Sequence, residues 1–291
     1  MNQQEQQRIH FFKMTGAGND FIVIDNRKGL VDADNCRDFV RNACRHKLSV
    51  GADGMILIEN DPEVDFKWRF FNADASEAEM CGNGARCAAR FASLTGIVQK
   101  PRMAFRTLAG VIKAELQGDR VKVQMTSPHS LQLDLNLEAN GMSFCVDSVN
   151  TGVPHAVCFA AEENDLESID VLRYGHAFRF HAHFQPAGTN VNFVYVQDAH
   201  HLVVRTYERG VESETLACGT GCIASTLVAA ARGRVASPVD VRTRGGESLR
   251  VYFEMSGENR SPADFQFKEV YLEGEARIAY EADLWTETLQ Q

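Results

Sequence analysis

The feature that most constrains this chain is a short cysteine motif that occurs twice. The two copies are Met80-Cys81-Gly82-Asn83-Gly84 and Ala217-Cys218-Gly219-Thr220-Gly221, and each runs into an alanine-rich apolar segment. An enzyme that needs one activated cysteine usually places only one. Two equivalent thiols therefore suggest two mirror-related roles. The inversion of a carbon centre is such a reaction, because one group takes a proton and the other returns one on the opposite face.

The spacing between the two motifs recurs along the chain. An offset of 137 residues separates Cys81 from Cys218, Gly51 from Gly188 and Glu77 from Glu214, and an offset of 136 separates Thr15 from Thr151. A fixed period is typical of a duplicated unit. We therefore predict two halves of one architecture, and 291 residues are enough for each half to have its own core.

Composition narrows the class of protein. A hydrophobic content of 44% and a charged content of 24% are ordinary for a globular protein. The net charge of −9 and the lack of a lysine or arginine run argue against nucleic-acid binding. The first residues lack the apolar core of a signal peptide, and the longest apolar run, Leu227 to Ala231, is too short for a bilayer. We expect a cytoplasmic protein without a membrane partner.

The eight cysteines are expected to be thiols rather than disulfides. No Cys-x-x-Cys is present, so neither a zinc site nor a thioredoxin-type redox pair is indicated, and we predict no metal. Six cysteines have apolar or helical surroundings typical of small buried hydrophobes, namely Cys36, Cys44, Cys87, Cys145, Cys158 and Cys222. Only Cys81 and Cys218 stand out.

Each of these two cysteines is predicted to lie at the start of a buried helix. Strong helix formers fill residues 83–94 and 221–233, and each helix has a glycine as its stop signal, Gly96 after the first and Gly233 at the end of the second. The free N–H groups and the positive dipole end of a helix favour a thiolate and attract a carboxylate. The glycines allow a ligand to approach the backbone.

Strands are expected around these helices. Residues 66–71 and 202–207 precede them, and hairpins over 103–125 and 239–253 follow. We also predict helices over 34–45, capped by Asp34, and over 165–173, and a loop over 256–262.

Four groups of residues together resemble the signature segments of the diaminopimelate epimerase family. They are Phe12 to Phe21, Phe71 to Asp74 with Glu77, Cys81 to Cys87, and Glu208 to Gly210 with Glu214 to Gly221. The resemblance implies an α+β fold of two pseudo-symmetric domains, each a mostly antiparallel sheet rolled around a central helix, with the active site in the cleft between them. The N-terminal half-domain would comprise residues 1–127 with 276–291, and the C-terminal one residues 128–275.

The family reaction, similar to that of proline racemase, converts LL-diaminopimelate to the meso form without pyridoxal phosphate or metal, in the synthesis of lysine and peptidoglycan precursors. The residues agree with it, since the chain carries no cofactor signature that could act as an electron sink. By resemblance Cys81 would deprotonate the LL isomer while Cys218 supplies the proton, and the roles exchange in reverse. The implied partner is a small diamino dicarboxylic acid. A homodimer is compatible with the family, although the sequence carries no interface signal.

Other matched positions imply substrate recognition. Asn19, Asn72, Asn190, Glu208 and Arg209 match the family's binding residues, and Gly82, Asn83, Gly219 and Thr220 would present donors to the reacting carboxylate. His155 and Glu214 are expected to support the thiols. Taken alone, His155 is better explained by a buried structural role, and Glu208 with Arg209 by an exposed ion pair.

One position departs from the family pattern. Val153-Pro154-His155 stands where the family usually has Asn-Pro-His, so an expected substrate contact is lost unless Asn150 or Thr151 replaces it.

Two alternatives stay open. One is a proline or hydroxyproline racemase, whose first cysteine motif typically has histidine in place of Asn83. The other is a non-catalytic redox sensor, in which Cys81 and Cys218 form a reversible disulfide.

Overall fold

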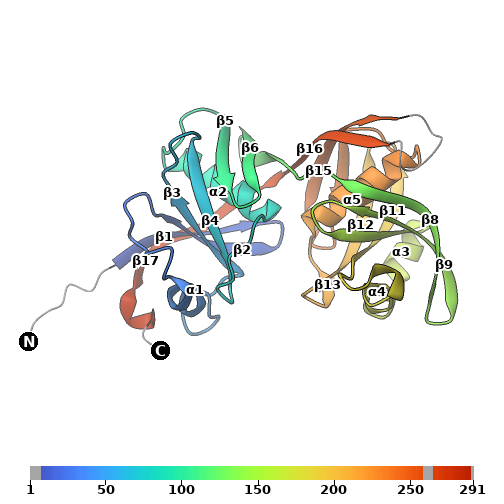
Figure 1. The fold of residues 1–291 in the computed structure, drawn as a ribbon, viewed down its shortest axis with the longest axis horizontal. Coiled ribbons are helices and arrows are strands. Elements are labelled where there is room, and N and C mark those ends of the chain that lie inside the picture. The colour runs from blue at the N-terminus through green and yellow to red at the C-terminus, as the bar shows by residue number, and fades with distance from the viewer. Residues whose placement is uncertain (1–7, 258–264, 290–291) are drawn as a thin grey trace, which may run out of the picture. The chain divides into compact units, whose positions relative to one another are not determined.

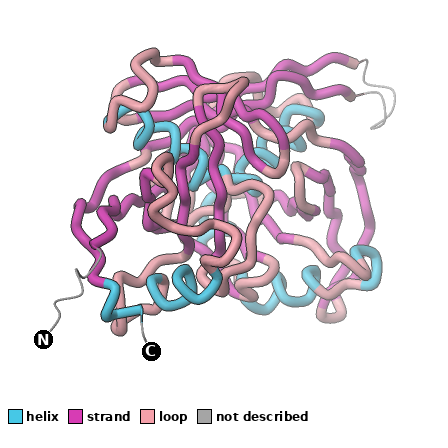
Figure 2. Tube along the Cα trace, turned by 60° about the vertical axis from the view of Figure 1, so that its left-hand side comes forward, coloured by secondary structure: helices cyan, strands magenta, loops and turns pink. Residues whose placement is uncertain are grey.

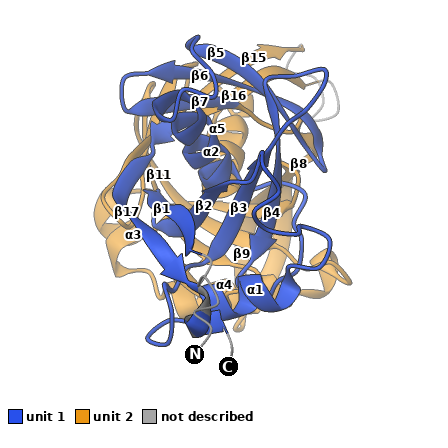
Figure 3. Cartoon of the chain, turned by 90° about the vertical axis from the view of Figure 1, so that its left-hand side faces the viewer, with its two compact units in different colours: residues 1–123, 274–291 blue, residues 124–273 orange. Residues whose placement is uncertain are grey.

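The computed structural model of this chain describes residues 8–257 and 265–289. The chain forms two compact units, unit 1 with residues 1–123 and 274–291 and unit 2 with residues 124–273 (Figure 3). Strands predominate over helices in both units (Figure 2). The fold is therefore mixed α+β, as the sequence predicts. None of the described helices is long and apolar enough to cross a membrane.

The sheet of unit 1 follows the order β17-β1-β2-β3-β4-β5-β6-β7. Most neighbours pair antiparallel, and only β2 with β3 and β4 with β5 pair parallel. The strands are β1 (Arg8–Gly16), β2 (Asn19–Asp25), β3 (Gly54–Glu59), β4 (Phe66–Asn72), β5 (Arg102–Thr107), β6 (Gly110–Gln117), β7 (Arg120–Gln124) and β17 (Arg277–Trp285).

The sheet of unit 2 follows the order β8-β9-β10-β11-β12-β14-β15-β16, and the short β13 also pairs with β12. Again only the third and fifth pairs, β10 with β11 and β12 with β14, are parallel. Both units therefore share one pattern of strand directions, which confirms the predicted repeat of the fold. The strands are β8 (His129–Ala139), β9 (Met142–Asn150), β10 (Pro154–Phe159), β11 (Asn190–Asp198), β12 (His201–Glu208), β13 (Ser213–Thr215), β14 (Val239–Arg242), β15 (Ser248–Ser256) and β16 (Gln266–Glu275).

Each sheet carries one buried helix against its strands, α2 (Gly82–Leu94) in unit 1 and α5 (Gly219–Ala231) in unit 2 (Figure 1). Every residue of α5 from Gly221 to Ala231 is buried. This explains why the segment is apolar all round, because a helix surrounded by sheet exposes no face to water. In α2 the same role falls to alanines and to Phe91, which makes an edge-to-face contact with Phe12 on β1.

The opposite face of each sheet is covered by shorter helices. In unit 1, α1 (Arg37–Ala43) packs over a cluster that includes Ile22 and Leu57. In unit 2, α3 (Glu163–Ser168) and α4 (Val171–Arg179) cover a cluster that includes Val191 and Phe193, and the short η1 (Ala182–Phe184) follows α4. Because side chains alternate along a strand, the apolar run of β3 serves both faces. In unit 1 a further short helix, η3 (Thr286–Leu289), follows β17.

Several local predictions need correction. Asp34 does not cap a helix, because α1 begins only at Arg37 and Asp34 pairs with Arg69 instead. The helix expected over 165–173 is two helices, separated where Asp170 accepts a hydrogen bond from the backbone N–H of Arg173 and caps α4. The predicted loop over 256–262 lies largely outside the described residues, because residues 258–264 are not described.

Two other features of the fold differ from expectation. Cys145 is exposed on β9 rather than buried, whereas Cys36, Cys44, Cys87, Cys158 and Cys222 are buried as predicted. The long β8–β9 hairpin was not expected at all. Its first strand does carry the signal, because Leu131, Leu133, Leu135 and Leu137 alternate with exposed polar residues, the period-2 pattern of a strand with one covered face. The prediction overlooked this pattern.

Candidate active site

Cys81 occupies the N-cap position of α2, where the sequence places it. Its backbone is extended (φ −144°, ψ 116°), and its Sγ accepts a hydrogen bond from the backbone N–H of Gly84 at 3.4 Å. An N-cap acceptor satisfies one of the donors that have no partner within the helix. The sulfur of a half-buried thiol therefore lies where helix N–H groups and the dipole stabilise negative charge.

Cys218 is the N-cap of α5 in nearly the same backbone conformation (φ −126°, ψ 108°). Its Sγ lies 3.5 Å from the hydroxyl of Thr220, in the first turn of the helix. The side chain is buried, with 7% of its surface exposed. The two cysteines thus begin equivalent helices in the two units, and each sulfur lies beside a polar group of the first helical turn.

In unit 1, the first turn of α2 is connected to the start of β2 by two asparagines. Asn83 Nδ2 donates to Asn19 Oδ1 at 2.7 Å, and Asn19 Nδ2 donates to Asp53 at 2.9 Å. On its other side, Asn83 Oδ1 accepts from the guanidinium of Arg86 at 2.8 Å. Asn83 and Arg86 are both buried. The chain of bonds fixes the orientation of both amides next to Cys81.

Asp53 is itself held in place, and sequence reasoning missed this part of the site. It accepts from the backbone N–H of Asp20, and its own N–H donates to the Asp20 carboxylate at 2.9 Å. Asp20 pairs with the buried ammonium of Lys13 at 2.7 Å. Lys13 and Asp20 lie in the segment Phe12 to Phe21, which resembles a signature segment of the family. That resemblance could have pointed to these two residues.

Asn72 ends β4 and lies apart from this chain of hydrogen bonds. Its side-chain amide donates to the hydroxyl of Ser76 at 2.9 Å, and its backbone N–H to the Ser76 carbonyl, so it closes the turn that follows the strand. The side chain is exposed.

In unit 2, Asn190 and Arg209 are brought together. Asn190 Nδ2 donates to the carbonyl of Pro154 at 3.1 Å, and its Oδ1 accepts from the backbone N–H of Arg209 at 2.9 Å. The Arg209 guanidinium donates to the carbonyl of Ala187. Glu208 is the last residue of β12, so it lies beside Arg209 at the end of the strand.

His155, which the sequence predicts to support a thiol, is completely buried on β10. Burial lowers the pKa of His155 to about 3, and the nearby charge of Arg209 adds to this effect. The imidazole is therefore neutral near pH 7. Its Nδ1 lies 3.1 Å from the amide nitrogen of Asn192, a residue that the sequence reasoning did not single out.

Val153 has an apolar side chain and cannot form the hydrogen bond of an asparagine at this position. Its two polar neighbours, Asn150 and Thr151, form hydrogen bonds with nearby residues of unit 2. Asn150 Oδ1 accepts from the backbone N–H of Gly152 at 2.9 Å, and the Thr151 hydroxyl donates to the carbonyl of Thr220 at 3.2 Å. Thr151 thus braces the turn that carries Thr220.

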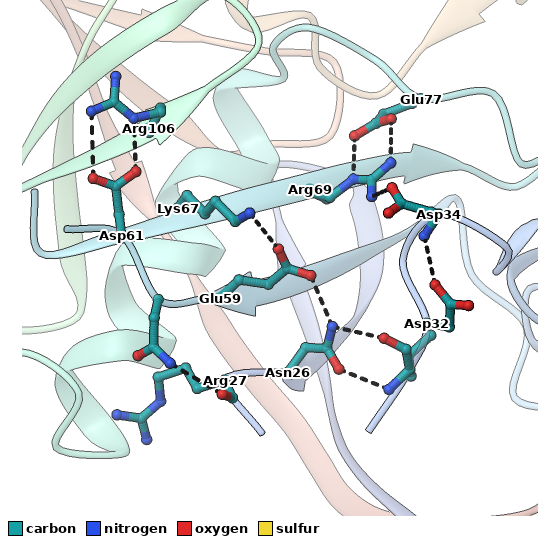
Figure 4. A network of polar contacts seen from close by, with 12 residues as sticks. Asn26, Arg27, Asp32, Asp34, Glu59, Asp61, Lys67, Arg69, Glu77 and Arg106 are labelled. Atoms are coloured by element: carbon teal, nitrogen blue, oxygen red, sulfur yellow. Dashed lines mark hydrogen bonds and ion pairs between the residues drawn. The ribbon is translucent and has the colours of Figure 1, made fainter. Parts of the chain in front are cut away.

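Matching ion pairs hold the loops that lead to the two cysteines. Arg69 on β4 binds both carboxylate oxygens of Glu77 at 2.7 and 2.8 Å, four residues before Cys81 (Figure 4). Arg205 on β12 binds Glu214 in the same two-point geometry at 2.7 and 2.9 Å, four residues before Cys218.

Each of these arginines also binds the segment beside the outer helices. Arg69 reaches Asp34, and Arg205 donates to the carbonyls of Leu166, Glu167 and Ile169 at the end of α3. The two-point ion pairs therefore tie each cysteine loop to the outer layer of its unit. The arginines are 136 residues apart, so the repeat could have revealed them.

Solved structures of low sequence identity share this fold. The Bacillus anthracis phenazine biosynthesis protein of the PhzF family matches with a TM-score of 0.71 and 13% identity, over 96% of this chain and 99% of that one. A probable proline racemase from Agrobacterium radiobacter K84 matches with a TM-score of 0.67 and 15% identity, over 94% and 92% of the two chains. The protein therefore has the two-unit fold of the PhzF and proline racemase structures.

Sequence comparison identifies the family. The diaminopimelate epimerase family model matches residues 11–131 and 148–270. The diaminopimelate epimerase of Aquifex aeolicus (strain VF5) is 46% identical over 97% of this chain and the whole of that protein, and that of Hydrogenobaculum sp. (strain Y04AAS1) is 48% identical over 83% and 90%. The chain belongs to the diaminopimelate epimerase family. It is an isomerase, an amino-acid epimerase.

Proposed function

We propose that this protein converts LL-2,6-diaminopimelate to meso-diaminopimelate by a two-thiol mechanism. The observation that carries the proposal is the equivalent placement of Cys81 and Cys218, each as the N-cap of the buried helix of its unit, in a chain of this family. The cytoplasm and the synthesis of lysine and peptidoglycan precursors are the proposed setting.

The proposed chemistry needs one base and one acid. The Cys81 thiolate takes the α-proton of the LL isomer and becomes a thiol, and the electron pair is left on the α-carbon and its carboxylate. The Cys218 thiol gives a proton to the opposite face of that carbon and becomes a thiolate. The proton count is unchanged, and the reverse reaction exchanges the two roles.

The α-proton of an amino acid is weakly acidic, so the charge that develops on the carboxylate has to be stabilised. The first N–H groups of a helix have no partner within the helix, and they point out of its N-terminus. We assign this role to the first turns of α2 and α5, that is to Gly82, Asn83, Gly219 and Thr220.

The remaining polar residues are proposed to bind the other groups of the substrate. An arginine fork suits a carboxylate, and carboxylate or amide oxygens suit an ammonium. We assign this recognition to Asn19, Asn72, Asn190, Glu208 and Arg209, with His155 and Glu214 in support.

The test is incubation with LL-diaminopimelate in deuterated water. Formation of the meso product with deuterium at the α-carbon supports the epimerase. Exchange with proline but not with LL-diaminopimelate moves the assignment to a racemase. No exchange with either substrate, together with reversible loss of both thiols on oxidation, favours the redox sensor.

The two-thiol mechanism is tested by substitution. Cys81→Ala and Cys218→Ala are each expected to abolish epimerisation, and full turnover in either variant would contradict the mechanism. Cys145→Ala is the matched control, because it removes an exposed thiol from β9 and should leave turnover unchanged.

A further inference from the structure

Asn192 lies directly beneath the start of α5. It is fully buried on β11, two residues after Asn190 and on the same face of that strand. A Cβ placed on Gly221 would lie 2.3 Å from Asn192 Oδ1, so only glycine fits above this amide. The amide is thus packed against the first turn of the helix that begins at Cys218.

The hydrogen bonds of Asn192 determine where the nitrogen and the oxygen of its side-chain amide lie. The side-chain nitrogen donates to the carbonyl oxygen of Ala156 at 2.9 Å, and the side-chain oxygen accepts from the hydroxyl of Thr206 at 3.0 Å. A backbone carbonyl can only accept, so the nitrogen has to face Ala156. The second hydrogen of the same nitrogen then points to Nδ1 of His155 at 3.1 Å.

This contact determines the tautomer of His155. A ring nitrogen that accepts a hydrogen bond carries no proton, so the single proton of the neutral imidazole is on Nε2. Nε2 is buried, and it has no hydrogen-bond partner among the residues that the structure describes. A buried N–H group without a partner is rare in folded proteins. It indicates that an acceptor arrives from a bound molecule or from a group that changes charge during the reaction.

We propose that Asn192 is a positioning residue that holds His155 as the neutral Nε2–H tautomer, so that His155 donates a hydrogen bond to an anion of the reaction centre instead of acting as a base. The acceptor is a thiolate or the carboxylate of the substrate, and this part rests on the proposed function. The tautomer itself does not depend on that function.

The first test is nuclear magnetic resonance of the whole protein with ¹⁵N-labelled histidine. We expect His155 to show a protonated Nε2 and a bare Nδ1 at neutral pH. A protonated Nδ1 would overturn the proposal without any substitution, whether or not the protein epimerises diaminopimelate. If the tautomer is as expected but no substrate exchanges deuterium, the proposed function fails while the tautomer stands.

The second test is Asn192→Asp, which keeps size and shape but cannot donate. An aspartate accepts a hydrogen bond, so the proton of His155 should move to Nδ1, and kcat should fall by about 10²-fold, the typical cost of losing one donor to a developing anion. Asn136→Asp on the exposed face of β8 makes the same chemical change without touching His155 and is the control. A switched tautomer with unchanged kcat would overturn the role of the donor.

The acceptor is identified by repeating the measurement in Cys81→Ala and Cys218→Ala. If the Nε2 proton shifts when LL-diaminopimelate is added to these variants, the acceptor is the substrate carboxylate. If the shift instead follows thiol ionisation in the parent protein and is lost in one variant, the acceptor is that thiolate. No response of Nε2 to either change contradicts a role in the reaction.

Discussion

Arg86 donates a hydrogen bond from its guanidinium to the side-chain oxygen of Asn83 at 2.8 Å, and both side chains are buried at the start of α2. The same guanidinium also reaches the carbonyls of Gly82 and Glu275. Because an amide has one acceptor end and one donor end, this bond obliges Asn83 Nδ2 to face Asn19. The orientation of the amide beside Cys81 is therefore set from within the helix.

Arg86→Met tests this relationship. The substitution keeps an apolar stem of similar length but leaves the buried Asn83 oxygen without this donor, so we expect unfolding to become about 1–3 kcal/mol easier. We also expect kcat/KM for epimerisation to fall, because the Asn83 amide can rotate. Arg90→Met is the control, since Arg90 lies one turn further along α2 and is only half-buried, donating to the carbonyl of exposed Asp119. Equal losses in both variants would contradict a specific role for Arg86.

The two-point ion pairs are tested by Glu214→Gln and Glu77→Gln. Each change removes one charge-assisted bond, and we expect about 1.5–3 kcal/mol of lost stability for Glu214 and less for Glu77. The difference arises because the Arg205 side chain is 9% exposed and the Arg69 side chain 21%. In addition, Arg69 keeps a carboxylate partner, Asp34, whereas the other hydrogen bonds of Arg205 go to uncharged backbone carbonyls. Urea unfolding measures the stability, and hydrogen exchange should rise in residues 208–218 only for Glu214→Gln.

A matched control for these pairs is Glu115→Gln. Glu115 pairs with Arg102, whose side chain is 81% exposed, so this surface pair should contribute about 1 kcal/mol at most. If Glu115→Gln destabilises the protein as much as Glu214→Gln, the two-point pairs hold the cysteine loops no more firmly than an ordinary surface contact.

The sequence was sufficient for the features that depend on local signals. The two cysteine motifs, the glycines and the alanine-rich segments specify a helix start, and α2 and α5 begin within two residues of the predicted positions. The offset of 137 residues also anticipated the matching sheets. Both inferences use neighbours in sequence or a period along the chain, which need no knowledge of tertiary contacts.

The contacts that orient the site could not be found in this way. Asn192 on β11 forms hydrogen bonds with His155 on β10 and with Thr206 on β12. These contacts depend on the register of the three strands, which cannot be read from the sequence. The exposure of Cys145 was missed for a similar reason. Its apolar neighbour Val146 is buried while Cys145 faces the other side of β9, and only the sheet decides which side is covered.

The buried histidine predicts how stability depends on pH. The pKa of His155 is about 3 in the folded protein and 6.5 for the ordinary group. Between these two pH values the unfolded chain therefore binds a proton on this imidazole and the folded chain does not. The contribution of His155 to the free energy of unfolding is therefore fully present above pH 6.5. It is lost as the pH falls toward 3, and the loss is about 3 kcal/mol at pH 4. Unfolding of the parent and of His155→Gln between pH 7 and pH 4 measures it. The variant should lose less stability over this range, and equal losses would show that His155 is not the group responsible.

The thiols predict a pattern of alkylation that separates structural cysteines from the proposed catalytic pair. Burial raises the pKa of Cys44 to about 12 and also raises the pKa of Cys158, so both should resist iodoacetamide at pH 8 until the protein is unfolded. Cys145 is exposed and should react, but slowly, because partial desolvation and then its hydrogen bond to Asp134 raise its pKa. Mass spectrometry of the alkylated peptides reads each site separately.

Substrate protection completes this prediction. LL-diaminopimelate at saturating concentration should slow the alkylation of Cys81 and Cys218, because in the proposed mechanism the bound substrate covers both sulfurs, while the rate at Cys145 stays the same. Cys145→Ser should remove the slow exposed site and leave protection at the other two unchanged. Protection of only one of Cys81 and Cys218 would contradict the proposed mechanism, in which the substrate contacts both thiols. Equal protection of Cys145 would show that the ligand acts by stabilising the whole fold.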